Sequence, residues 1–251
     1  MSGKLEKKVK GTAETFTESE DVAKVHVKPI KCLNERQKQL IKTIDEKEVT
    51  ICSGLAGSGK TFMSLWLALK MLEKKQVERI VLVKSVTTVP NEEIGYLRGS
   101  LEEKMEPFMI SFFGNIDKLI GERQREKLVE DGKIVVQPIA YLRGVNIDRS
   151  IVLLDEAQNI TIPTFKTIIT RIGEGSKYVI LGDTEQVDMK RREESALSKL
   201  IDLFTDDEIV GVCSFTDADC VRNPIIPHML DKIKSLEMSV VDASLGQKKK
   251  K

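Results

Sequence analysis

Short apolar runs alternate with longer amphipathic segments over most of this chain. The apolar runs predict β-strands at 49–52, 80–83, 134–136, 151–154, 178–181 and 209–212. Apolar residues that recur every three to four positions predict helices at 34–44, 62–72, 164–172, 194–204 and 225–236, and the segment 91–133 is predicted to be helical and amphipathic. Strands that are apolar throughout and alternate with helices predict an α/β fold, in which helices cover both faces of a parallel sheet.

The two ends of the chain differ from its middle. Residues 1–28 are polar and carry few large apolar side chains, and residues 238–251 finish in a run of lysines. Both segments are predicted to be flexible, which leaves 29–237 as a single domain with 91–133 as a helical insertion. Lysine runs of this kind are typical of solvated tails, although they also give weak, salt-sensitive affinity for nucleic acids.

Composition narrows the class of protein. The 251 residues carry a net charge of +1 and are 41% hydrophobic. Because no apolar stretch approaches the roughly 20 residues of a membrane-spanning helix, we expect no membrane partner. The chain has 4 cysteines with no C-x-x-C pair and 2 histidines, so reduced thiols are favoured over disulfides and a histidine metal centre is not expected. These features predict a cytoplasmic protein.

The segment 54–61 reads GLAGSGKT and fits the phosphate-binding pattern G-x-x-x-x-G-K-[ST] at every defined position. It follows a predicted strand and precedes a predicted helix, which is the context that the pattern requires. Its glycines let backbone N–H groups turn toward phosphates, and the start of the helix adds a positive dipole end. The residues predicted to bind the nucleotide here are Gly54, Ala56, Gly57, Ser58, Gly59, Lys60, Thr61 and Phe62.

Acidic and amide side chains follow two later strands. Asp155 and Glu156 end the strand 151–154, and Asp183 follows the strand 178–181. Because the carboxyl ends of parallel strands meet at one edge of a sheet, these groups are predicted to converge on the phosphate loop. Asp155 would then hold Mg²⁺ together with Thr61, and Glu156 would orient and polarise the attacking water.

Two glutamines complete the predicted site. Gln186 and Asp183 are placed to sense the terminal phosphate or its water, with Lys60 contributing charge to catalysis. Gln37 precedes the loop on the first helix, and its amide can both donate to and accept from an adenine edge. These residues predict ATP and Mg²⁺ as cofactors.

The order of these motifs resembles superfamily 1 helicases and, more closely, the PhoH-like ATPase family. The closer resemblance rests on segments 101–107, 138–144, 154–159, 170–173 and 182–188 and covers about residues 33–236. It implies a RecA-like P-loop core that hydrolyses ATP and an RNA helicase activity. Single-stranded nucleic acid, RNA more than DNA, is the partner that the resemblance implies.

A single RecA-like core lacks a second domain to supply arginines to the transferred phosphate. The hypothesis is therefore that a neighbouring subunit supplies them in a head-to-tail ring, which by resemblance is a hexamer. The candidates are Arg143, Arg171 and Arg222.

Other functions stay open at the level of sequence. The alternative to a nucleic-acid motor is a nucleotide-gated scaffold or regulatory ATPase that works through protein partners. A phosphotransferase is disfavoured by the Asp155–Glu156 pair, since the second carboxylate suits water activation. A GTPase is disfavoured because the chain has no Asn-Lys-x-Asp motif.

Overall fold

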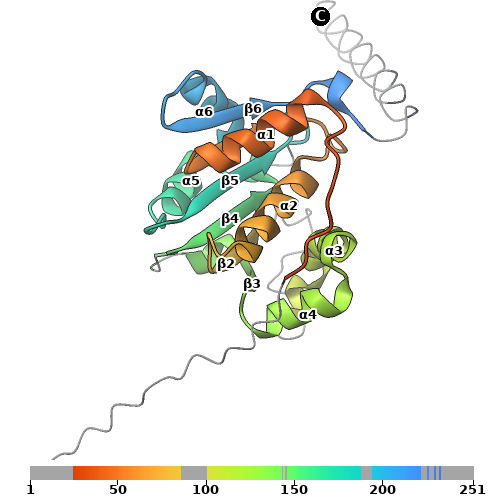
Figure 1. Cartoon of the computed structure of the whole chain (residues 1–251). Helices are drawn as coiled ribbons and strands as arrows, with labels where there is room; N and C mark the ends of the chain where they lie inside the picture. The colour runs from red at the N-terminus through yellow and green to blue at the C-terminus, as the bar shows by residue number, and fades with distance from the viewer. Residues whose placement is uncertain are drawn as a thin grey trace, which may run out of the picture.

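The computed structural model describes residues 25–85, 101–142, 144, 146–187, 194–221, 225, 229 and 232. Its centre is a six-stranded, wholly parallel sheet with the strand order β3-β2-β4-β5-β1-β6 (Figure 1). The strands are β1 (Val49–Ser53), β2 (Arg79–Lys84), β3 (Ile134–Pro138), β4 (Ser150–Asp155), β5 (Lys177–Gly182) and β6 (Val210–Ser214).

Helices cover both faces of this sheet. They are α1 (Glu35–Glu46), α2 (Lys60–Glu73), α3 (Leu101–Ile120), α4 (Glu122–Glu130), α5 (Ile162–Ile169) and α6 (Ala196–Phe204). One apolar core includes side chains of α1, α2, α3 and α4, and a second, on the other face, includes those of α5 and α6. In Figure 1, α1 and α2 lie across the front of the sheet. The predicted α/β fold, a parallel sheet with helices on both faces, is confirmed.

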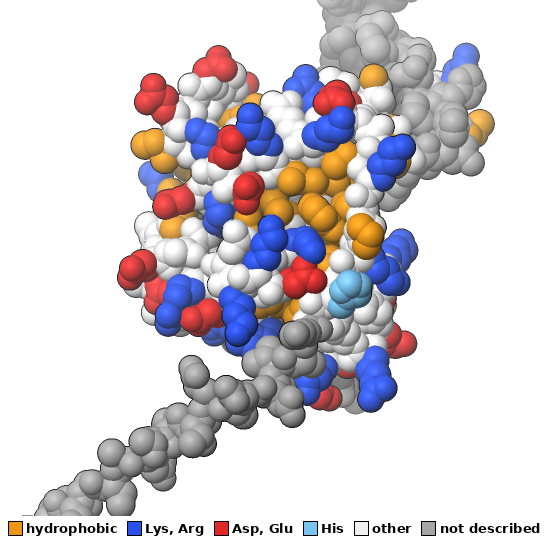
Figure 2. Space-filling view, viewed as in Figure 1, with side chains coloured by type: hydrophobic (Ala, Val, Ile, Leu, Met, Phe, Trp, Pro, Cys, Tyr) orange, Lys and Arg blue, Asp and Glu red, His pale blue; other side chains and the backbone are white. Residues whose placement is uncertain are grey.

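The strands alternate their side chains between the two cores. Cys52 of β1 packs into the core under α1 and α2, whereas its neighbour Ile51 packs into the core under α5 and α6. Because both faces are covered, the strands are apolar at consecutive positions and show no polar alternation. Figure 2 shows that hydrophobic side chains also gather on the outer surface near α2 and the segment before α1, with charged side chains around them.

The sheet topology brings distant residues to one edge. β5 lies between β1 and β4, and its end is in register with the end of β1 through the pair Ser53 and Gly182. The chain therefore leaves β1, β4 and β5 at the same edge. The phosphate loop, Asp155 and Asp183 meet there, as the sequence predicts.

Several element boundaries differ from the predicted ones. The helix predicted at 164–172 is α5, which begins at Ile162 because Thr161 caps it: the Thr161 hydroxyl accepts from the Thr164 N–H. The insertion predicted at 91–133 contains two helices, α3 and α4, that meet at Gly121. Of the predicted helix 225–236 the structure describes residues 225, 229 and 232, and residues 91–100 lie outside the described part.

The folded core begins before residue 29. Val25 and Val27 are buried, and the backbone N–H of Lys28 donates to the carbonyl of Leu119 at 3.0 Å. The end of the segment predicted to be flexible therefore packs against α3, while residues 1–24 lie outside the described part. Within the described residues, no helix combines the length and the apolar character that crossing a membrane requires.

Candidate functional site

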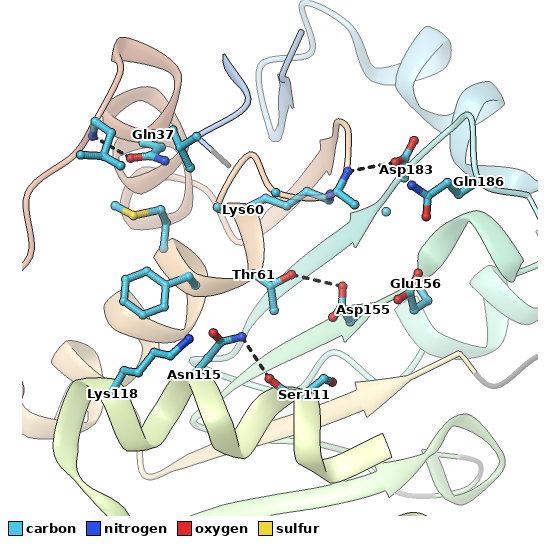
Figure 3. A pocket seen from close by; sticks show the side chains of 18 of the residues that line it. Gln37, Lys60, Thr61, Ser111, Asn115, Lys118, Asp155, Glu156, Asp183 and Gln186 are labelled. Atoms are coloured by element: carbon cyan, nitrogen blue, oxygen red, sulfur yellow. Dashed lines mark hydrogen bonds between the residues drawn. The ribbon is translucent and has the colours of Figure 1, made fainter. Parts of the chain in front are cut away.

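A cleft of about 510 Å³ opens where the carboxyl ends of the strands meet the start of α2 (Figure 3). It is lined by most of the residues that the sequence predicts for the site. These are Gln37, Ala56, Gly57, Gly59, Lys60, Thr61, Phe62, Asp155, Glu156, Asp183 and Gln186. Gly54 and Ser58 belong to the same loop but do not line the cleft: Gly54 lies against Phe215, and Ser58 is fully buried.

The phosphate loop takes a shape that requires glycine. Gly59 has φ +87°, and a Cβ there would lie 2.8 Å from Nε2 of Gln37. Gly54 has φ +154°, and a Cβ there would lie 2.5 Å from Cβ of Phe215. An L-residue at either position would be strained and would also collide with a neighbour. The spacing of glycines in the sequence thus encodes the curl of the loop.

Lys60 places its charge inside this curl. Its Nζ donates to the carbonyl oxygens of Gly54 at 2.7 Å and Leu55 at 3.2 Å, and the side chain is largely buried. Lys60 is also the first residue of α2, so its ammonium adds to the positive dipole end of that helix. Buried positive charge beside free helix N–H groups makes this loop a site for an anion of the size of a phosphate group.

Thr61 and Asp155 form the candidate metal site. The Thr61 hydroxyl lies 3.4 Å from Oδ1 of Asp155. Burial raises the pKa of Asp155, and the neighbouring Glu156 carboxylate raises it further. A carboxylate that is partly shielded from solvent and lies beside a second carboxylate is stabilised by a nearby cation, so these groups fit Mg²⁺. Within the described residues no cluster of three or more acidic, histidine or cysteine ligands occurs, so nucleotide oxygens and water would complete the coordination.

The backbone of Glu156 is held in an unusual conformation. Its φ of +57° lies in the left-handed region, which non-glycine residues seldom adopt. Oε2 of Glu156 accepts from Nε2 of Gln158 at 2.7 Å, and Oε1 lies 3.7 Å from Nζ of Lys84. The carboxylate thus has a partner on each oxygen, and in Figure 3 it lies beside Asp155 at the edge of the cleft.

Asp183 is fixed between the phosphate loop and the loop after β4. Its Oδ2 accepts from the N–H of Ala56 at 3.1 Å, and its Oδ1 accepts from the N–H of Glu185 at 3.0 Å. Its own N–H donates to Oε1 of Gln158 at 3.0 Å. Gln158 therefore connects the backbone of Asp183 to the carboxylate of Glu156.

The side chain of Gln37, on α1, contacts the phosphate loop. The amide is buried, its Oε1 accepts from the N–H of Leu33 at 2.8 Å, and its Nε2 donates to the carbonyl of Ser58 at 3.0 Å. The side chain therefore ties α1 to the phosphate loop. The predicted contact of this amide with adenine stays a prediction.

Known proteins resemble this chain in sequence over most of its length. The family described as "PhoH-like protein" matches residues 29–234. The chain belongs to the PhoH-like protein family. It is 35% identical over 202 residues to a PhoH-like protein of Synechocystis, covering 80% of this chain and 61% of that protein. It is 34% identical over 204 residues to Protein PhoH of Escherichia coli K12, covering 80% of this chain and 57% of that protein.

The PhoH-like chain thus spans about 60% of the length of these two curated relatives. Solved structures resemble it more distantly. A large terminase from the thermophilic bacteriophage D6E gives a TM-score of 0.44 at 14% identity, covering 75% of this chain and 47% of that chain. The Sulfolobus solfataricus SWI2/SNF2 ATPase core in complex with dsDNA gives 0.40 at 14% identity, covering 61% of this chain and 32% of that chain.

Of the three arginines predicted for this PhoH-like chain, Arg171 lies within the described residues, and it does not line the cleft. Arg171 follows α5, and its carbonyl accepts from the N–H of Ile147, a residue shortly before the start of β4. It therefore lies toward the amino ends of the strands, at the opposite edge from the phosphate loop. Arg143 and Arg222 lie outside the described residues.

Some residues of this PhoH-like site were missed by the sequence predictions. Lys84 ends β2 and comes directly after an apolar strand, as Asp155 does, so its position at the sheet edge was open to prediction. Gln158 lies in the same motif as Glu156. The other unpredicted lining residues are Lys31, Leu33, Met63, Ser111, Asn115, Lys118, Gly182 and Val221.

Among these, Ser111, Asn115 and Lys118 recur at helical spacing on α3, and Figure 3 shows them on the side of the helix that faces the cleft. Their spacing indicates a common face. Nothing in the sequence says that α3 packs beside the phosphate loop.

Proposed function

We propose that this PhoH-like domain binds ATP together with Mg²⁺ and hydrolyses it, which releases the terminal phosphate. The observation that carries the proposal is the meeting of Lys60, the Thr61–Asp155 pair and Glu156 in one cleft. Each group supplies a different part of the reaction: anion binding, metal binding and activation of water. A phosphate-binding loop alone would support nucleotide binding without turnover.

The residues act in a definite arrangement. Loop N–H groups and the Lys60 ammonium bind the phosphate oxygens, with Asp183 holding the loop at Ala56. Thr61 and Asp155 would hold Mg²⁺, which when bound neutralises charge that develops on the phosphates. The Glu156 carboxylate, oriented by Gln158, accepts a proton from the attacking water.

ATP is the proposed nucleotide. The sequence has no Asn-Lys-x-Asp motif for guanine. Phe62 and Leu33 line the cleft beside Gln37, and they offer apolar surface for a purine ring.

Hydrolysis is proposed to require a second copy of the chain. No arginine is found among the described residues that line the cleft, and Arg171 lies at the other edge of the sheet. A head-to-tail ring, proposed to be a hexamer, would bring Arg143, Arg171 or Arg222 of one subunit to the phosphates of the next. The PhoH-like resemblance supports single-stranded RNA as the polymer on which such a ring would act, by translocation or unwinding.

The proposal is tested by phosphate release from ATP, with and without single-stranded RNA or DNA. Lys60→Ala is the control variant, and removal of its charge is expected to lower turnover at least about 100-fold. Several-fold stimulation by RNA supports the nucleic-acid motor. Turnover that nucleic acid leaves unchanged favours the nucleotide-gated scaffold. A wild-type protein that binds ATP and Mg²⁺ but releases no phosphate overturns the proposal.

A further inference from the structure

Lys84 lies at the carboxyl end of β2, beside the two acidic residues that end β4. The two strands are neighbours, with Lys84 in register with Asp155. Nζ of Lys84 is 3.7 Å from Oε1 of Glu156, and the two side chains are 19% and 39% exposed. This ion pair therefore lies at the wall of the cleft itself. It is more enclosed than the surface pair Lys199–Glu194, whose side chains are 59% and 77% exposed.

The Glu156 carboxylate of this ion pair also has a second partner, Gln158. Gln158 donates to Oε2 of Glu156 at 2.7 Å, while Lys84 faces Oε1. The backbone of Glu156 has φ +57°. Because the backbone is fixed and both carboxylate oxygens have partners, the orientation of the Glu156 carboxylate is restricted. A general base needs a fixed orientation, because it can accept a proton only from a water molecule within hydrogen-bond reach.

Lys84 is itself well placed to hold this geometry. The next residue, Ser85, donates from its N–H to the carbonyl of Asp155 at 3.1 Å and from its hydroxyl to the carbonyl of Asn159 at 3.1 Å. The end of β2 is thus joined to both ends of the loop that carries Glu156. On its other side, Nζ of Lys84 lies 3.5 Å from the Ser111 hydroxyl of α3. The ammonium therefore stands between α3 and the acidic loop.

We propose that Lys84 is a positioning residue for ATP hydrolysis: with Gln158, it orients the Glu156 carboxylate toward the attacking water. This inference rests on the proposed function. A partly exposed ion pair contributes little to folding stability, so loss of Lys84 should appear mainly in turnover. Because Lys84 acts on the base and not on the phosphates, the Michaelis constant for ATP should change little.

The test compares Lys84→Met and Lys84→Arg with the wild type in steady-state phosphate release with Mg²⁺. Lys84→Met is expected to lower kcat about tenfold or more and to change KM less than about threefold, since it removes the charge but keeps much of the stem. Lys84→Arg is expected to recover most of kcat. Lys199→Met is the matched control, because it removes an exposed lysine from a Lys–Glu pair whose residues do not line the cleft, and it should match the wild type.

A double-mutant cycle shows whether Lys84 acts through Glu156. In a Glu156→Gln background, where the residual rate is followed with radiolabelled ATP, Lys84→Met is expected to cause less than about a twofold further loss. An equal fractional loss in both backgrounds overturns the inference. So does a Lys84→Met protein that keeps wild-type kcat, or one that raises KM at unchanged kcat, which would place Lys84 on the nucleotide.

Thermal unfolding of each variant separates positioning from folding. A loss of kcat in both Lys84→Met and Lys84→Arg, accompanied by a lower Tm, overturns the positioning role. If the wild type hydrolyses ATP and Lys84→Met does so equally well, only the Lys84 inference fails. If the wild type binds Mg²⁺ and ATP but releases no phosphate, the proposed function fails and the Lys84 inference fails with it.

Discussion

The carboxylate of Asp183 accepts a hydrogen bond from the backbone N–H of Ala56, which lies 127 positions earlier in the chain, at 3.1 Å. The contact is possible because β1 and β5 are adjacent and end in register at Ser53 and Gly182. It joins the phosphate loop to the loop that carries Gln186. The residue predicted to sense the state of the nucleotide is therefore hydrogen-bonded directly to the loop that is predicted to bind it.

Substitution of Asp183 should weaken both binding and turnover. Asp183 accepts from two backbone N–H groups, those of Ala56 and Glu185. Asp183→Asn keeps one acceptor oxygen and Asp183→Ala keeps none, and each lost hydrogen bond to a charged group costs about 1.5–3 kcal/mol. We expect kcat/KM to fall about tenfold for the first variant and about 100-fold for the second, as measured by phosphate release. Equal rates for Asp183→Ala and the wild type would show that the contact has no part in the site.

Substitution of Gln37 tests whether its amide braces the loop or reads the base. Both polar atoms of the buried amide already have backbone partners, at Leu33 and Ser58. We expect Gln37→Ala to lower Tm and to weaken ATP and GTP binding by similar factors, as measured by calorimetric titration. A loss confined to ATP would instead place the amide at the adenine edge, as the sequence predicts.

Asp155→Asn should stabilise the metal-free protein. Burial and Glu156 raise the pKa of Asp155, so its charged form is disfavoured in the folded state. Removing that charge is expected to add on the order of 1 kcal/mol at neutral pH, or about 2–4 °C in Tm, measured in the presence of a chelator. The same variant should lose the stabilisation that Mg²⁺ and ATP give the wild type.

The pH dependence of this effect has a definite sign. Because the folded pKa lies above the unfolded one, the folded wild type binds the proton more tightly. The unfolding free energy of the wild type therefore rises, relative to that of Asp155→Asn, as the pH falls through the folded pKa. We expect the advantage of the variant to be largest at neutral pH and to shrink in acid. An advantage that grows in acid would contradict this account.

Two glycine substitutions provide a matched pair. Gly59→Ala places a Cβ 2.8 Å from Nε2 of Gln37 at a position with φ +87°. It is expected to destabilise the fold by about 1–3 kcal/mol. Gly114→Ala, within α3, meets nothing within 4 Å and is expected to stabilise by about 0.5–1 kcal/mol. Chemical denaturation measures both, and a Gly59→Ala protein as stable as the wild type would show that the loop tolerates a side chain there.

Much of the fold was predictable because the signals are local. Apolar runs such as 151–154 and the glycine pattern at 54–59 depend on neighbouring residues only, and both are where the sequence predicts. Helix α5 begins at Ile162, before its predicted start, because the Thr161 side chain caps its first turn, and it ends at Ile169, before its predicted end.

The parts of the site that escaped prediction depend on tertiary neighbours. Lys84 approaches Glu156 only because β2 lies next to β4, although β3 comes between them in the sequence. The sequence placed Gln37 on a helix but not behind the phosphate loop. Strand order and helix docking follow from the packing of the whole domain, and no local pattern encodes them.

The most direct test of the central claim is phosphate release from ATP and Mg²⁺ by the wild type, Lys60→Ala and Glu156→Gln, with ATP binding measured in parallel. The account predicts steady turnover by the wild type. It predicts binding and turnover both lost in Lys60→Ala, and binding kept but turnover reduced at least about 100-fold in Glu156→Gln. Turnover by Glu156→Gln at the wild-type rate would contradict the assignment of this cleft as a hydrolytic site.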